Sequence, residues 1–293
     1  STAKRLYLAG DDDQAIYRWL GADVERFIEY PGTKIVLPQS YRVKKKVQNF
    51  AQQIITVTKN RIQKEWDSQE EEGVLKYHQN MQSVDLSTGN WLLLGRDKYV
   101  LNNLEEECRN QGLWYEKQEH KNIVRPISQR MFDAVIGWSD LMKGEMIDKK
   151  TIKKVFFYKR VSDKYEEELD MMNDKHLYDL DTLTILFGPF SVGEWHKALD
   201  KINLQDRAYL LRLAMGNEDI TKHPRIKIST IHAAKGGECD NVLLTTDMNI
   251  KTYQSYQKDS DDEQRVFYVG ATRAKEELHV LLPQTTMHFK LAL

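Results

Sequence analysis

Hydrophobic and polar residues alternate along the chain with two different periods, and these periods predict strands and helices. Short apolar runs bounded by Gly, Pro or charged residues are typical of strands. Such runs occupy residues 6–9, 34–37, 74–77, 91–94, 226–230, 242–245 and 278–282. Apolar residues that recur at three- and four-residue intervals predict amphipathic helices. This spacing covers residues 24–30, 43–55, 97–111, 127–142, 191–202, 205–214 and 264–275.

The pattern changes character between residues 119 and 222. Helical spacing dominates there, and strand-like runs are scarce. Charge comes in blocks, with a basic stretch from 149 to 160 and a mostly acidic stretch from 166 to 181. This segment is therefore predicted to be mainly helical.

Composition limits the class of protein. The chain has 293 residues, of which 41% are hydrophobic, which is enough for one large domain or two modest ones. The formal net charge is -1, so any affinity for nucleic acid has to come from a local groove. Cys108 and Cys239 are too far apart in sequence for a metal-ligand motif and are typical of reduced cytoplasmic thiols. Because no apolar run approaches the length of a membrane span, we expect a globular cytoplasmic protein without a membrane partner.

The stretch from Gly10 to Asp23 carries the first candidate chemistry. Gln14 can both donate and accept hydrogen bonds, so it can contact a phosphate oxygen and orient an attacking water. Tyr17 and Trp19 offer flat faces on which nucleic-acid bases can stack. In the alternative interpretation, Gln14 is a surface amide and both aromatic residues are core residues beneath a loop.

A second candidate pair precedes the helix predicted at 43–55, for which Ser40 is a plausible N-cap. The phenol ring of Tyr41 can support a purine, and the guanidinium of Arg42 matches a phosphate bidentately. The basic residues that follow have no acidic neighbour between Arg42 and Lys64. They form either a solvated face or a phosphate-facing surface, and they are Lys44, Lys45, Lys46, Lys59 and Arg61.

Two segments near the end of the chain are further candidates. Residues 231–238 join two predicted strands by a small-residue loop that contains His232 and Lys235, which suits a phosphodiester but is also typical of a tight strand connection. Arg265 and Arg273 fall on one side of the helix predicted at 264–275. A buried arginine pair without acidic partners is costly, so the pair is either exposed or serves an anionic ligand.

These segments resemble four signature motifs of superfamily 1 helicases of the UvrD/Rep type. The first, GDDDQAIYRWLGA, matches the third motif of that family, GDxxQ-[SA]-I-Y-x-[FW]-x-G-A. Tyr41-Arg42 is similar to the fourth motif, N-Y-R-S, and residues 230–239 are similar to the fifth, T-x-H-x-x-K-G-x-E-F. Residues 263–274 resemble the sixth, E-x-R-x-x-Y-V-A-x-T-R-A. The resemblance runs over nearly the whole chain.

The resemblance implies a role for each matching residue. Gln14 would report on the γ-phosphate of ATP, and Arg42 and Arg273 would act on it catalytically, with Arg273 as an arginine finger. ATP would also be bound by residues that provide an adenine platform, a loop glycine and a ribose contact, namely Tyr41, Gly236 and Glu238. Single-stranded or partly duplex DNA would meet a third set, namely Tyr17, Trp19, Thr230, His232 and Arg96. Without the resemblance, Arg96 is a surface arginine at a strand end.

The sequence departs from the family pattern beside several of the candidate residues. Ser40 and Val43 replace the usual Asn and Ser around the Tyr-Arg pair. Gly237 stands where Leu is usual and Cys239 where Phe is usual, which alters the packing of that loop. Leu20 replaces a frequently basic residue beside the aromatic pair, which removes one phosphate contact.

The resemblance also implies a fold, namely an α/β RecA-like parallel sheet flanked by helices, with an inserted mainly helical subdomain. Residues 1–35 would be the tail of a first RecA-like domain that carries the third motif. Residues 36–118 and 223–293 would be the two parts of the second RecA-like domain. Residues 119–222 would be the inserted helical subdomain.

The motifs that hold phosphate and magnesium in this family are absent from the sequence. No Gly-Lys-[Ser/Thr] occurs, and no acidic pair ends a strand before Gly10. We therefore expect the C-terminal part of an ATP-dependent DNA helicase, a 3′ to 5′ single-stranded DNA translocase of repair or replication, inactive without a missing N-terminal RecA-like domain. ATP with Mg²⁺ would be the cofactor of the full-length parent, and no metal ligand is assigned in this chain.

Three other functions are alternatives to this expectation. A degenerate helicase half could serve as a non-catalytic DNA- or partner-binding module, although such a module has no need of Gln14, Tyr41, Arg42 and Arg273. A helicase–nuclease subunit would need a set of carboxylates and a lysine for the nuclease site, and the sequence contains no such set. The related 5′ to 3′ helicases fit residues 15–17 and 232–236 less well.

Overall fold

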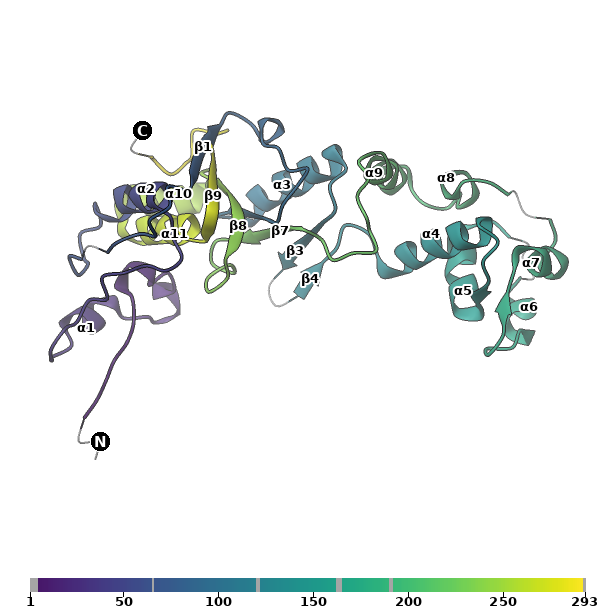
Figure 1. The fold of residues 1–293 in the computed structure, drawn as a ribbon, viewed down its shortest axis with the longest axis horizontal. Helices are drawn as coiled ribbons and strands as arrows, with labels where there is room; N and C mark the ends of the chain where they lie inside the picture. Colours follow the sequence, from purple (N-terminus) through teal and green to yellow (C-terminus); the bar gives the residue numbers. More distant parts are fainter. Residues whose placement is uncertain (1–4, 65, 120–121, 162–164, 190–191, 292–293) are drawn as a thin grey trace. The chain divides into compact units, whose positions relative to one another are not determined.

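The computed structural model describes residues 5–64, 66–119, 122–161, 165–189 and 192–291 (Figure 1). The chain divides into two compact units. The first unit contains the residues up to 108, residues 113–124 and the residues from 222 onward. The second unit contains residues 109–112 and 125–221.

A seven-stranded sheet forms the centre of the first unit, in the order β1-β9-β8-β2-β7-β3-β4. Its strands are β1 (Val74–His78), β2 (Trp91–Gly95), β3 (Tyr115–Glu119), β4 (Asn122–Val124), β7 (Ile226–Thr230), β8 (Cys239–Thr245) and β9 (Ala274–Leu281). Neighbouring strands run parallel, except that β4 pairs antiparallel with β3. Strand β2 is buried along its whole length, as its continuous apolar sequence predicts for the middle of a parallel sheet. The predicted α/β fold with a parallel sheet is confirmed.

Helices lie on both faces of this sheet. α2 (Lys45–Ile55) and α11 (Asp261–Ala271) share a core with the face of β2 and β8 that presents Leu92, Leu94 and Val242. On the other face, α3 (Lys98–Gln111) contacts β3, because Glu105 of α3 accepts hydrogen bonds from Tyr115 and Lys117. Figure 1 shows α2, α11 and α10 (Ile250–Lys258) gathered beside β9.

Three short elements precede α2, namely the 3-10 helices η1 (Asp12–Gln14) and η2 (Arg18–Leu20) and the helix α1 (Val24–Glu29). A third 3-10 helix, η3 (Met81–Ser83), follows β1. Asp23 caps α1 by accepting a hydrogen bond from the Arg26 amide at 2.8 Å. The side chain of Arg265, on α11, donates to the backbone carbonyl of Asp12 at 3.0 Å. The η1 segment is therefore attached directly to α11.

The second unit is mainly helical, as predicted. Its elements are α4 (Gln129–Met142), β5 (Ile147–Asp148), α5 (Lys149–Tyr158), α6 (Tyr165–Met171), β6 (Leu177–Tyr178), α7 (Leu180–Phe187), α8 (Trp195–Ala198) and α9 (Leu204–Met215). Four of its helices begin at side-chain caps, provided by Ser128, Asp148, Asp179 and Asn203. Trp138 and Phe156 are fully buried in its core. Within the described residues, no helix has both the length and the apolar character needed to cross a membrane.

Two predicted strands are wrong. Residues 6–9 and 34–37 form no strand, and their side chains stay in solvent, with Tyr7 83% exposed and Ile35 83% exposed. A strand is stabilised by the neighbours with which it pairs. Neither segment pairs with another strand in the part of the chain that the structure describes. Their apolar sequence alone therefore does not make them strands.

Three helix predictions need correction. Of the helix predicted at 191–202, only α8 (Trp195–Ala198) forms. It cannot begin earlier because Gly193 has a left-handed φ of 142°, and it ends where Leu199 leaves the helical conformation. Residues 190–191 lie outside the described part of the chain. α11 ends at Ala271 instead of 275, and β9 begins at Ala274. The N-cap position of α2 is Lys44, while the Ser40 hydroxyl accepts from the Arg42 and Val43 amides in the turn before it.

Candidate functional site

The η1 loop is fixed to the first unit by a cluster of acidic and basic side chains. Arg61 donates two hydrogen bonds to Asp13, at 2.9 and 2.8 Å, and both side chains are almost completely buried. Lys64 donates to Asp11 at 2.9 Å and also to Asp12. Burial alone would lower the pKa of Lys64, but the neighbouring aspartates outweigh burial and raise it. The loop that carries Gln14 is thus held in one position.

Gln14 lies beside the loop that joins β7 to β8. Its side-chain amide donates to Asp11 at 2.6 Å, and its backbone carbonyl accepts from Lys235 at 2.8 Å. The Lys235 ammonium also lies 5.3 Å from the centre of the Tyr17 ring. Residues 14, 17 and 235 therefore meet, although they come from opposite ends of the chain.

Tyr17 also contacts His232, in the same loop as Lys235. Its hydroxyl donates to the His232 carbonyl at 2.6 Å, and the two rings are 5.8 Å apart. Burial, together with the positive charge of Arg96, lowers the pKa of His232 to about 4, so the imidazole is neutral at neutral pH. Thr230 closes the turn by accepting a hydrogen bond from the Ala233 amide at 3.1 Å.

Arg273 is the most unusual cation in this region. Its guanidinium is almost fully buried and donates to the carbonyls of Val269 and Gly237 and to the Thr272 hydroxyl, at 2.9, 3.0 and 3.2 Å. Burial, and then the charge of Arg42, lower its pKa to about 10. It forms no ion pair with a carboxylate in the part of the chain that the structure describes.

Arg42 is close enough to Arg273 for the two charges to repel. Its Nη1 lies 3.8 Å from a Glu238 carboxylate oxygen, and its Nε is buried without a hydrogen-bond partner. Tyr41, next to it, is 85% exposed. Gly236, in the same loop as Glu238, has a left-handed φ of 89°, which a residue with a side chain rarely adopts.

This arrangement fits an anionic group. The two guanidinium groups are close enough to repel each other, one has an orphaned N–H, and the other is bonded only to neutral oxygens. A phosphate would supply both the missing acceptor and the missing negative charge. Among the described residues, no group of three or more His, Cys, Asp or Glu side chains could hold a metal ion.

Two other candidate arginines, Arg265 and Arg96, have different hydrogen-bond partners from Arg273. Arg265 is as deeply buried as Arg273, but it donates to the backbone carbonyls of Asp12 and Asn60. Arg96 forms two hydrogen bonds to Glu263, at 2.6 and 2.7 Å. The side chain of Trp19 lies outside the described residues, although its backbone belongs to η2.

Sequence reasoning missed the residues that hold the site together. It interpreted Arg61 as part of a solvated or phosphate-facing run, whereas Arg61 is buried against Asp13. It also assigned no role to Lys64, Asp13 or Glu263. The available signal was the run of three aspartates before Gln14, which requires basic partners if it is buried.

The fold and this region define an α/β protein with a mostly parallel sheet, in which paired arginines, a lysine and a glutamine converge from distant segments. Residues 96–285 match the UvrD-like helicase C-terminal domain family. The chain belongs to this family.

Curated relatives support the same assignment. The chain is similar to Gabija protein GajB of Bacillus cereus, with 24% identity over 95% of this chain and 58% of the relative. ATP-dependent DNA helicase PcrA of Bacillus subtilis is 22% identical over 57% of this chain and 22% of the relative. A probable DNA helicase II homolog of Rickettsia conorii is 24% identical over 96% of this chain and 57% of the relative. The chain thus spans less than two thirds of the length of each of these relatives.

Proposed function

We propose that this chain supplies half of the ATP site and part of the DNA path of an ATP-dependent DNA helicase. The observation that carries the proposal is the Arg42–Arg273 pair, in which the two buried or half-buried cations lack a carboxylate at hydrogen-bond distance. Such a pair stabilises the negative charge that develops on a phosphoryl group in transfer. The PcrA relatives are named as ATP-dependent DNA helicases, which agrees with this use.

In the proposed ATP site, Arg273 is the arginine finger, Arg42 binds the terminal phosphate and Gln14 senses it. Tyr41 is exposed and free to support the adenine, while Glu238 contacts the ribose beside the Gly236 turn. Because the sequence contains no P-loop motif, the phosphate cradle and the Mg²⁺ ligands would come from a further RecA-like domain. Hydrolysis then requires the two halves to close on the nucleotide.

The proposed DNA path uses the neighbouring loop. Tyr17 and Trp19 would stack on bases, and Thr230 and His232 would contact the strand. A neutral His232 contributes hydrogen bonds instead of charge, and Arg96, fixed by Glu263, adds positive potential beside it. Closing and opening of the ATP site would move single-stranded DNA past these residues in the 3′ to 5′ direction, in a cytoplasmic protein of DNA repair or replication.

The domain assignment is part of the same proposal. Residues 1–35 would end the first RecA-like domain, and residues 36–118 and 223–293 would form the second. Residues 119–222 would be its inserted helical subdomain.

ATP hydrolysis with and without single-stranded DNA tests this function. The present chain would be compared with a form extended upstream to include a P-loop segment. Activity that is stimulated by DNA and confined to the extended form is the expected result. ATP hydrolysis by the present chain would contradict the half-site proposal. If neither form hydrolyses ATP, a non-catalytic DNA- or partner-binding module is favoured.

A further inference from the structure

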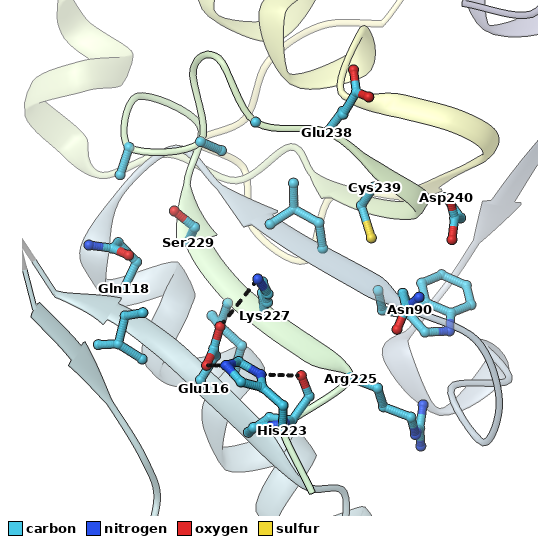
Figure 2. Close-up of a pocket in the computed structure, with 18 of the residues that line it drawn as sticks. Asn90, Glu116, Gln118, His223, Arg225, Lys227, Ser229, Glu238, Cys239 and Asp240 are labelled. Carbon is cyan, nitrogen blue, oxygen red and sulfur yellow. Dashed lines mark hydrogen bonds and ion pairs between the residues drawn. The ribbon is translucent and has the colours of Figure 1, made fainter. Parts of the chain in front are cut away.

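A cavity of about 580 Å³ lies over strands β7 and β3 of the sheet (Figure 2). Strand register places Leu92 of β2, Lys227 of β7 and Glu116 of β3 in one row across its floor. Ser229 and Gln118, two residues further along β7 and β3, also line it. Since side chains alternate between the faces of a strand, these residues share one face of the sheet.

The cavity exists because this face is only partly covered by helices. α2 and α11 form a core with the β8 and β2 residues of the same face, such as Val242 and Leu92. Beyond them, β7 is joined to β8 by a loop of turns at residues 231–238 instead of a helix. Gly237 of this connection and Cys239 at the start of β8 are both small lining residues, so the space over β7 and β3 stays open.

Glu116 is the chemically distinctive residue of this cavity. It is only 4% exposed, and its Oε2 is buried without a hydrogen-bond partner. The nearest basic side chains are Lys227, whose Nζ lies 3.5 Å from Oε1, and His223, whose Nε2 lies 3.6 Å from Oε2. Figure 2 shows both side chains directed at the carboxylate. These distances exceed the ~2.7–2.9 Å of a charge-assisted hydrogen bond, so the buried carboxylate lacks strong donors.

A ligand that supplies N–H donors would complete this site. A second cation would be repelled by Lys227, whose positive charge already lies beside the carboxylate. Neutral donors avoid that repulsion and still satisfy both oxygens. Among the nucleobases, guanine presents two adjacent donors, N1–H and N2–H, which match the two oxygens of a carboxylate. The volume is in the range of small-molecule pockets, ~300–1,000 Å³.

The rest of the cavity wall carries charges of both signs, because Glu238 and Asp240 line it together with basic side chains. Arg225 and Lys227 are both on the wall of the cavity, and the Lys227 side chain is more than half exposed. His223, with a side chain 65% exposed, can move aside at little cost when a base reaches Glu116. A phosphate attached to the guanosine would pair with Lys227 and Arg225.

We propose that this cavity binds a guanosine nucleotide, with Glu116 accepting hydrogen bonds from N1–H and N2–H of the base and with Lys227 and Arg225 facing its phosphate. The cavity shares Glu238 with the proposed ATP site, but its base contact, Glu116, belongs to neither the proposed ATP site nor the proposed DNA site. Recognition of guanine by Glu116 can therefore be tested without reference to ATP hydrolysis. The guanine can come from a free nucleotide or from a single strand.

Isothermal titration calorimetry of the 293-residue chain with GMP, IMP and AMP tests the proposal. GMP is expected to bind about 10- to 100-fold more tightly than AMP, because a matched pair of donors is lost in AMP. IMP, which keeps N1–H and lacks the N2 amino group, is expected to fall between them. Equal affinity for GMP and AMP, or no saturable GMP binding, overturns the proposal.

Two variants and a matched control locate the binding. Glu116→Gln removes the carboxylate and Cys239→Phe fills the cavity, so each is expected to weaken GMP binding about 10-fold or more. Glu119→Gln, at the end of the same strand, is expected to bind GMP as the unchanged chain does. Circular dichroism confirms that each variant is folded. If both cavity variants retain the original GMP affinity, the site is elsewhere and the proposal fails.

An oligothymidylate that carries one central guanine distinguishes the sources of the base. If it competes with GMP and plain oligothymidylate does not, the cavity accepts guanine from a strand. If neither strand competes, the ligand is the free nucleotide. Competition by both strands to the same extent contradicts recognition of guanine.

Discussion

At the scale of single residues, the arginines differ in the groups that compensate their charge. Arg265 and Arg96 are satisfied by fixed partners, namely backbone carbonyls for one and Glu263 for the other. Arg273 is equally buried, but its pKa falls to about 10 because burial and Arg42 both oppose its charge. A protein tolerates such an unneutralised cation where an anion is to be bound. Glu116, in the cavity over β7 and β3, is also buried, and its Oε2 accepts no hydrogen bond.

His232 makes stability depend on pH. Its pKa is about 4 when folded and 6.5 otherwise, so between these values the unfolded chain binds a proton that the folded chain does not. Stability from this residue is therefore complete above pH 6.5 and is lost as the pH falls toward 4, by at most about 3 kcal/mol. The free energy of unfolding would be measured by urea denaturation at pH 7 and at pH 5. Between these two pH values, His232→Asn is expected to lose less of this free energy than the original chain.

The exposed residue His176 provides the control for that comparison. His176→Asn is expected to keep the pH dependence of the original chain, since the other buried histidines are unchanged. An identical pH dependence in the His232 and His176 variants would show that His232 is protonated equally in both states.

At the scale of elements, the apolar pattern predicted those strands and helices that are buried by their neighbours. β2 and α3 follow the predicted periods because their apolar residues meet the sheet and its helices. The same kind of pattern failed at residues 6–9 and 34–37, where the described residues offer no pairing strand. The spacing of apolar residues shows which segments can be buried. A segment becomes a strand only where a neighbouring strand is present to pair with it.

The attachment of η1 to α11 and its surroundings depends on the Asp13–Arg61 pair. Both side chains are almost fully buried, so removing one leaves an unpaired charge in the interior. Arg61→Ala is expected to lower the free energy of unfolding by about 3–5 kcal/mol, measured by urea denaturation. The matched control is Lys45→Ala, which breaks an exposed pair with Glu72 and is expected to cost about 1 kcal/mol or less. Equal costs for the two variants would contradict the anchoring role of Arg61.

At the scale of the whole molecule, the sequence motifs predicted which segments meet, but not how they are held. The resemblance pointed to Gln14, Tyr17, His232, Arg42 and Arg273, and the structure brings them into two neighbouring sets of contacts within the first unit. The anchoring pairs and the Glu116 cavity could not be predicted. They depend on strand register and on the space left by small residues, neither of which has a local sequence signal.

The central claim is that Arg273 acts as an arginine finger in a composite ATP site. The most direct test is the DNA-stimulated ATPase rate of a P-loop-containing extended form that carries Arg273→Ala. We expect kcat to fall by about 10³-fold or more while ATP binding is retained. Arg160→Ala, which removes a side chain 84% exposed, is the control and is expected to leave kcat unchanged. Undiminished turnover in the Arg273 variant would contradict the account.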